Sequence, residues 1–302
     1  MQPVKVILNP AAGRGYGAKA EEKVRHYLTA EGLRFDLVRT EGPWHAAQLA
    51  QDAAEDGFET IVSAGGDGTA NEIINGLMTA SQNGANRRMG VIPAGSGSDF
   101  ASGVGLPLEL EEACRRIACP ETKTIDIGRV TVPGQATRYF GNVVGIGFDG
   151  KVLVETLKMK RLRGLPLYLL AVLKTIFTNF ESPQVTVEYD ERQIDLPITL
   201  VSVANGPREG GGFIIAPDAN LCDGLLDVCI AEKVSRLTIL RLLPHFLKGS
   251  HTDLDPITMV QAKTVTVSSP DGLVAHVDGE VLCTEARQVK CEIMPGVLKI
   301  CA

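Results

Sequence analysis

The chain has 302 residues, of which 44% are hydrophobic and 22% are charged, and its formal net charge is −6. These values are typical of a globular protein with one large domain or two ordinary domains. The negative net charge argues against general nucleic-acid binding, because such binding needs a basic surface.

The first 120 residues alternate between short β-rich segments and helical segments. Strands are predicted at residues 4–8, 35–38, 60–63 and 89–93, and helices at about 18–30, 45–55, 70–78 and 110–117. This order predicts a doubly wound α/β domain with a mostly parallel sheet. Ligands collect at the carboxyl ends of the strands in such sheets. Four of these ends carry turn-forming loops, at residues 9–13, 40–42, 65–69 and 93–99.

Beyond residue 120 most connections are turns rather than helices. Strands are predicted at residues 124–132, 138–144, 184–189, 196–204, 225–231, 263–267 and 274–277, with helical insertions at 165–180 and 235–247. This pattern predicts a mainly antiparallel β-sandwich. We therefore expect one domain over residues 1–124 and a second over residues 125–302, from which the last strands can return to the first.

Cysteine usage and the N-terminal sequence predict a cytoplasmic protein. The seven cysteines form no CxxC pair, which favours buried, reduced thiols over a zinc site. Only a short apolar run precedes Asn9-Pro10, so we expect no secretory signal. The apolar segment 165–180 is interrupted by Lys174 and falls short of the roughly twenty apolar residues that span a bilayer.

The glycine turn at residues 65–69 predicts a phosphate site. A strand, a glycine turn and the start of a helix together present backbone N–H groups to an anion. Asp67 would repel a phosphate, but it can recruit Mg²⁺ to a nucleotide. The alternative interpretation is an ordinary tight turn in which Asp67 caps the helix.

Two acidic segments in the second half are further candidates. Asn220 and Asp223 lie in a turn-rich loop whose oxygen atoms suit Mg²⁺ or Ca²⁺, although Asx turns explain the same pattern. Asp278 and Glu280 stand two residues apart and would share one face of a strand, where a carboxylate can accept the proton of a hydroxyl. A plain hairpin turn is the alternative for this second segment.

Taken together, these motifs resemble those of one family, the diacylglycerol kinase catalytic superfamily, and in particular its soluble bacterial lipid kinases. The motifs occur in the family's order: NPAAG at 9–13, GGDGT at 65–69, PAGSGSDF at 93–100, GIGFDG at 145–150, APDANLCDGLLDV at 216–228 and DGE at 278–280. GGDGT is shared with NAD kinases, whereas the last two motifs are more specific for lipid kinases. Ser96 and Ser98 depart from the threonine and asparagine that are usual there.

The resemblance implies a role for each matching position. The residues that match the ATP site are Asn9, Pro10, Ala11, Ala12, Gly13, Thr40, Gly65, Gly66, Asp67, Gly68, Thr69, Ala70, Asn71, Glu72 and Ser96. Asn220, Asp223 and Leu225 match a structural Mg²⁺ site, in which Asn220 and Leu225 act through their carbonyl groups. One member of the pair Asp278 and Glu280 matches the catalytic base, and Asp67 would help to position the Mg²⁺–phosphate complex.

The implied function is an ATP- and Mg²⁺-dependent kinase that phosphorylates a lipid hydroxyl, such as that of diacylglycerol. The basic cluster at residues 158–163 and the adjoining apolar helix would bring the enzyme to the inner membrane surface. A homodimer is compatible with this hypothesis, and no nucleic-acid partner is expected. The alternatives are a kinase of a soluble acceptor, of the NAD kinase type, and a non-catalytic lipid-binding protein on a kinase scaffold.

Overall fold

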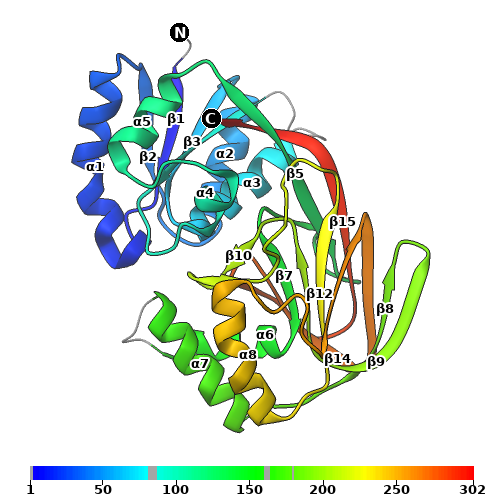
Figure 1. The fold of residues 1–302 in the computed structure, drawn as a ribbon. Helices are drawn as coiled ribbons and strands as arrows, with labels where there is room; N and C mark the ends of the chain where they lie inside the picture. Colours follow the sequence, from blue (N-terminus) through cyan, green and yellow to red (C-terminus); the bar gives the residue numbers. More distant parts are fainter. Residues whose placement is uncertain (1–2, 81–86, 160–163, 179) are drawn as a thin grey trace. The chain divides into compact units, whose positions relative to one another are not determined.

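The computed structural model describes residues 3–80, 87–159, 164–178 and 180–302. The chain divides into two compact units, each described here by itself (Figure 1). Unit 1 comprises the residues up to Ile127 together with Pro295–Ala302, and unit 2 comprises Gly128–Met294. Two strands, β5 (Thr122–Thr131) and β15 (Glu280–Cys301), therefore contribute residues to both units.

Unit 1 is built on a parallel sheet. Its strands are β1 (Val4–Leu8), β2 (Phe35–Arg39), β3 (Thr60–Gly65), β4 (Arg88–Pro93) and the end of β15. Their order is β2-β1-β3-β4-β15, and each neighbouring pair is parallel. The last pairing is short, with Lys299 opposite Arg88 and Ile300 opposite Met89.

Helices cover both faces of this sheet. They are α1 (Ala12–Ala30), α2 (His45–Glu55), α3 (Asp67–Ala80), α4 (Asp99–Val104) and α5 (Leu110–Ala118). Val6 and Leu8 pack in one core with residues of α1 and α5. Ile7 lies between them and is also fully buried, so it points to the opposite face, where α2 and α3 pack on the sheet. The predicted doubly wound α/β class is confirmed.

Unit 2 is a closed, mainly antiparallel β-structure. Its strands are the end of β5, β6 (Arg138–Phe140), β7 (Val143–Gly147), β8 (Gln184–Tyr189), β9 (Arg192–Ala204), β10 (Arg208–Glu209), β11 (Phe213–Ile214), β12 (Leu226–Glu232), β13 (Ile257–Ala262), β14 (Thr264–Val277) and most of β15. The long strands β9 and β14 pair with β7 along one half and with β8 along the other. This double pairing encloses a core rich in valine and isoleucine, as predicted for the second half.

Within its described residues, unit 2 also contains the helices α6 (Phe148–Leu157), α7 (Gly164–Thr178) and α8 (Arg236–Lys248) (Figure 1). Helix α6 was not expected from the sequence, and the segments 263–267 and 274–277 form one bulged strand, β14. Among the helices within the described ranges, none is long and apolar enough to cross a bilayer. Lys160, Arg161 and Arg163, in the expected basic cluster, lie outside the described residues.

Candidate active site

The glycine turn of unit 1 joins β3 directly to α3. Asp67 is the first residue of α3, so the backbone N–H groups of Gly66 to Thr69 lie at the positive end of the helix dipole. An ideal Cβ on Gly95 would lie 2.3 Å from Cα of Gly66, so the loop after β4 approaches the turn more closely than any side chain would allow. Both loops line a small cavity of about 190 Å³.

The Asp67 carboxylate holds these two loops together. Its Oδ1 atom accepts a hydrogen bond of 2.9 Å from the backbone N–H of Phe100, in the first turn of α4. The loop at Gly97 comes equally close, since a Cβ there would lie 2.6 Å from Asp67 Oδ2. Asp67 is therefore placed beside the N-terminus of α3, where a phosphate-bound cation would need an oxygen ligand.

The loop after β1 is hydrogen-bonded to the first turn of α3. Asn9 Nδ2 donates to Thr69 Oγ1 at 3.0 Å, and Asn9 Oδ1 accepts from the backbone N–H of Ala11 at 3.0 Å. A Cβ on Gly13 would lie 3.5 Å from the backbone nitrogen of Ser96, so this loop also meets the loop after β4. The structure thus brings the predicted loops 9–13, 65–69 and 93–99 together at one edge of the parallel sheet.

Arg14 is a residue at this edge that the sequence analysis missed. Gly13, Arg14 and Gly15 have positive φ values of 56°, 55° and 92°, so α1 becomes regular only after them. A left-handed conformation is uncommon for a residue other than glycine, and such conformations gather at ligand sites. The exposed Arg14 guanidinium adds the positive charge that a triphosphate attracts.

The other predicted nucleotide residues are less exposed. Thr40 is buried, and its backbone N–H donates to the carbonyl of Leu8 at 2.9 Å, beside the loop after β1. Asn71 and Glu72 are buried in α3. Glu72 Oε2 accepts a hydrogen bond of 3.0 Å from the backbone N–H of Ala46, in the first turn of α2. The geometry gives Glu72 a structural contact between two helices.

In unit 2, several acidic side chains lie in and beside the loop before β12. Asn220 and Asp223 are exposed and form Asx turns with the backbone N–H groups of Cys222 and Leu225, at 3.2 and 3.0 Å. Burial raises the pKa of the nearby Asp227, and the charges of Asp223 and Asp218 raise it further, although Gln261 donates a hydrogen bond to it. This accumulation of carboxylates fits a divalent cation, which would relieve their repulsion.

The pair Asp278 and Glu280 turns out to have two different environments. Asp278 and Gly279 have φ values of 43° and 83° and form the two-residue hairpin turn between β14 and β15. The Asp278 carboxylate accepts hydrogen bonds of 2.8, 3.0 and 2.9 Å from the backbone N–H groups of Gly141, Asn142 and Val143. Glu280 instead pairs with Arg138 Nη2 at 2.5 Å and is partly exposed.

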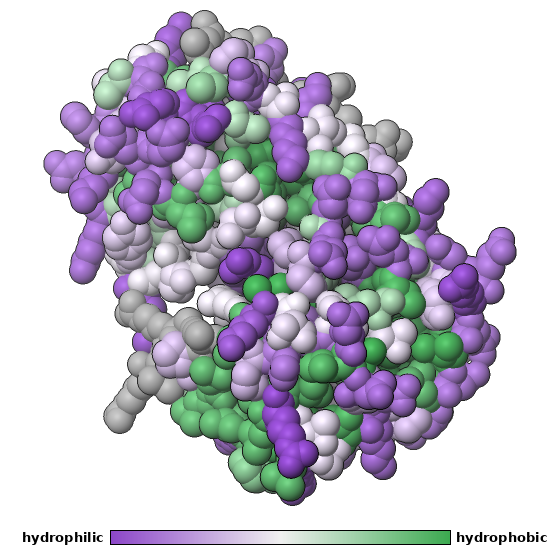
Figure 2. Space-filling model, viewed as in Figure 1, coloured by the Kyte–Doolittle hydropathy of each residue, from purple (hydrophilic) through white to green (hydrophobic). Residues whose placement is uncertain are grey.

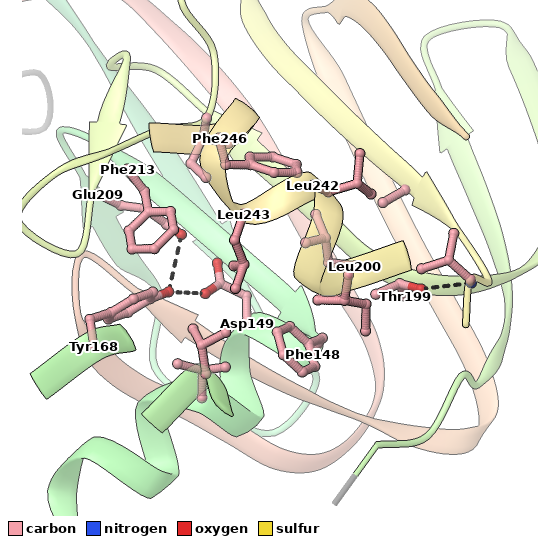
Figure 3. Close-up of a pocket in the computed structure, with 16 residues that line it drawn as sticks. Phe148, Asp149, Tyr168, Thr199, Leu200, Glu209, Phe213, Leu242, Leu243 and Phe246 are labelled. Carbon is pink, nitrogen blue, oxygen red and sulfur yellow. Dashed lines mark hydrogen bonds between the residues drawn. The ribbon is translucent and has the colours of Figure 1, made fainter. Parts of the chain in front are cut away.

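A buried polar cluster in unit 2 was not predicted. It consists of Asp149 on α6, Tyr168 on α7, Glu209 on β10 and His276 on β14. Figure 3 shows the Tyr168 hydroxyl between the carboxylates of Asp149 and Glu209, to both of which it is hydrogen-bonded. His276 Nε2 lies 3.0 Å from Asp149 Oδ2 and 3.7 Å from Glu209 Oε2.

The pKa shifts in this cluster follow from its geometry. Burial alone would raise the pKa of Asp149, but the charge and hydrogen bond of His276, with the hydrogen bond from Tyr168, hold it well below its ordinary value. Burial and the two neighbouring carboxylates raise the pKa of Tyr168 well above its ordinary value. Asp149 therefore stays ionised at neutral pH, and Tyr168 remains a hydrogen-bond donor.

Asp149, Tyr168 and Glu209 of this cluster form the polar corner of an open pocket (Figure 3). The other walls are almost wholly apolar. They comprise Phe148 and Val152 of α6, Val172 of α7, Leu200 of β9, Phe213, Ile215, Ala231 and Val234, and Ile239, Leu242, Leu243 and Phe246 of α8, with Thr199 among them. The lining suits a ligand with a long apolar part.

Comparisons with known proteins identify the family of both halves of the chain. Residues 3–130 match the model of the diacylglycerol kinase catalytic domain, and residues 142–302 match that of the YegS C-terminal NAD kinase beta sandwich-like domain. A diacylglycerol kinase of Mycobacterium tuberculosis (strain ATCC 25618 / H37Rv) is 31% identical over 300 residues, which cover 98% of this chain and 94% of the relative.

Two further similarities extend over most of the chain. A diacylglycerol kinase of Bacillus subtilis (strain 168) is 31% identical over 283 residues, which cover 93% of this chain and 90% of the relative. The crystal structure of a candidate diacylglycerol kinase from Bacillus anthracis str. Sterne has a TM-score of 0.79 at 25% identity, and the match covers 99% of this chain and 94% of that one. The family expected from the motifs is confirmed: this chain belongs to the diacylglycerol kinase family and is a lipid kinase by that membership.

Proposed function

We propose that the protein transfers the γ-phosphoryl group of ATP, in the presence of Mg²⁺, to the hydroxyl of diacylglycerol or a closely related lipid. The observation that carries this proposal is the pocket of unit 2, which joins apolar walls to a single polar corner. An acyl chain would lie against the walls, and the polar end of the lipid would lie toward Asp149, Glu209 and Tyr168. A soluble acceptor such as NAD would need many more polar partners than these walls offer.

Unit 1 would supply the nucleotide site. The N–H groups at the start of α3 and the loop after β1 would hold the phosphates, with Arg14 as a charged partner. Asp67 would orient the Mg²⁺–phosphate complex. Mg²⁺, when bound, neutralises charge on the phosphate oxygens. Phosphoryl transfer depends chiefly on such positioning and charge neutralisation, and little covalent chemistry is asked of the protein.

We assign the catalytic base to Glu280. Three backbone N–H groups already donate to the Asp278 carboxylate, so its oxygen atoms are less available to a lipid hydroxyl. Glu280 would accept the proton of the lipid hydroxyl as the hydroxyl oxygen bonds to the γ-phosphorus and the bond to ADP breaks. Arg138 would hold the Glu280 side chain in place.

The activity test is label transfer from radioactive ATP to a panel of lipids in mixed micelles. We expect labelling of diacylglycerol or a related lipid and none of NAD. The Asp67→Ala variant should lower turnover at least about a hundredfold, the scale of losing one charge-stabilising group. Near-normal turnover by this variant would count against the nucleotide site described here.

A pocket-filling variant links the same assay to the lipid site. Ala231→Phe places a large side chain in the apolar wall, so it should lower kcat/KM for a long-chain lipid more than for its short-chain analogue. Ala231 does not belong to the polar corner, so ATP use with the short-chain analogue serves as the control. Equal losses for both lipids would show that the acyl chain lies elsewhere.

Mg²⁺ binding at the loop before β12 has a test that does not depend on activity. Without nucleotide, MgCl₂ should raise the melting temperature of the wild type by at least about 2 °C, since each kcal/mol of binding shifts a chain of this size by a few degrees. Asp223→Ala should abolish the rise, because it removes the side-chain oxygen ligand. Asp271→Ala, at another exposed aspartate of unit 2, should retain it. Equal rises in the two variants would place the cation elsewhere.

A further inference from the structure

Helix α7 is apolar on two opposite faces. Ala171, Val172 and Ile176 are buried, as expected for a helix that packs on a core. Leu170, Leu173 and Phe177 follow the spacing i, i+3, i+7 and therefore share one face, yet 45%, 39% and 62% of their surfaces are exposed. An exposed apolar stripe of this kind marks an interaction surface.

Neighbouring helices carry further exposed apolar side chains. Leu157 at the end of α6 is 66% exposed, and Leu237 in the first turn of α8 is 67% exposed. Both helices pack against α7. Among the residues that the structure describes, five of the eight large apolar side chains with high exposure thus lie on these three helices. Figure 2 shows apolar side chains gathered over this part of unit 2.

The same helices carry positive charge. Helices α7 and α8 contain no aspartate or glutamate, and four of their exposed residues are cationic: Lys174, Arg236, Arg241 and Lys248. The whole chain has a net charge of −6, so this surface has the opposite sign to the protein. Lys174 and Lys158 share the buried Glu155, at 2.7 and 2.6 Å, so most of the uncompensated charge comes from α8.

We propose that this α7–α8 surface, with Leu157, Leu170, Leu173, Phe177 and Leu237 as its apolar part and the four cations beside them, docks on an anionic lipid bilayer. Cationic and apolar side chains on one surface are what an anionic membrane interface binds. The choice of a bilayer rests on the proposed function. The opposite sides of α7 and α8, through Val172, Leu242 and Phe246, wall the pocket that would receive the lipid. A docked bilayer would thus lie next to the wall of that pocket.

The test is co-sedimentation of the full chain with vesicles of phosphatidylglycerol and of phosphatidylcholine. We expect binding to phosphatidylglycerol that weakens at 0.5 M salt. Arg236→Glu with Arg241→Glu should weaken it at least about tenfold, given the contribution of each cation near an anionic surface. The matched control, Arg192→Glu with Lys263→Glu, makes the same charge change at exposed residues by the β8–β9 turn and should bind as the wild type does.

A second pair of variants tests the contribution of the apolar side chains to vesicle binding. Phe177→Ser should weaken vesicle binding, whereas Leu108→Ser, at a 53% exposed leucine of unit 1, should not. Equal effects of the α7–α8 variants and their controls would overturn the proposal. So would a wild-type dimer that Phe177→Ser converts to a monomer by light scattering, because a second copy would then cover the surface.

Failure of this proposal is distinguishable from failure of the proposed function. None of Phe177, Arg236 and Arg241 lines the pocket, so their variants should still phosphorylate a short-chain lipid in micelles. Vesicle binding without phosphorylation of any lipid would refute the proposed function and leave the docking surface in place.

Discussion

Glu280→Gln should lower lipid phosphorylation at least about a hundredfold and leave the fold intact, because it removes a general base and little else. The glutamine can still accept a hydrogen bond from Arg138, and a partly exposed ion pair contributes about 1 kcal/mol or less to stability. Turnover in mixed micelles measures the first effect, and urea unfolding measures the second. Near-normal turnover would rule out Glu280 as the base.

Asp278→Ala is the matched contrast, and its main effect should be on stability. It leaves the N–H groups of Gly141, Asn142 and Val143 without their acceptor and puts alanine at a positive φ of 43°. Three lost hydrogen bonds at buried residues should cost about 3 kcal/mol or more. Asp278→Asn removes the charge of the carboxylate but places asparagine, which tolerates a positive φ, in the turn. A folded Asp278→Asn variant without activity, beside an active Glu280→Gln variant, would reverse the assignment.

Asp149→Asn should lower the free energy of unfolding at pH 7 by about 3 kcal/mol, the scale of removing a charged acceptor from buried hydrogen-bond donors. His276 and Tyr168 would each lose a charged hydrogen-bond partner that is itself buried. Glu292→Gln is the control, because its partners Arg129 and Lys290 are partly exposed and such ion pairs contribute about 1 kcal/mol or less. Equal losses in the two variants would show that the buried cluster has no special stability.

The destabilisation caused by Asp149→Asn should also depend on pH. Because the folded state holds the pKa of Asp149 below its unfolded value, its stabilising effect is complete above the unfolded pKa, near 4. The effect is lost as the pH falls through the lower, folded pKa. The stability difference between wild type and Asp149→Asn should therefore shrink in acid, as urea unfolding at several pH values would show. A difference that grows in acid would contradict the direction of the shift.

The loops that meet at the edge of the parallel sheet were predictable because their signals are local. A short strand, two or three glycines and the start of a helix follow one another directly at residues 60–70, and the same holds for the loop after β1. Parallel strands then bring such loops to one edge without further information. The roles of Glu72 and Asp278 were not predictable in this way. Their contacts, with Ala46 and with residues 141–143, join segments that only the tertiary fold brings together.

The polar cluster could not be predicted either, because only the tertiary fold brings its residues together. Asp149 and His276 are 127 positions apart, and neither belongs to a motif of paired acidic residues. Gly145 is a residue of the GIGFDG motif that reflects the position of this cluster. An ideal Cβ there would lie 2.2 Å from His276 Nε2 and 2.3 Å from Asp149 Oδ2, so only glycine leaves room for the pair. Helix α6 was missed because its first residues, Phe148-Asp149-Gly150, were considered only as part of the GIGFDG motif.

The pairing of β15 with β4 has a consequence for synthesis on the ribosome. Lys299 and Ile300 complete the sheet of unit 1, yet all of residues 128–294 come before them in the chain. The N-terminal sheet therefore emerges with β4 as an unpaired edge, which is a site for wrong association until it is covered. Nascent chains arrested before residue 295 should need chaperones more than the finished protein does.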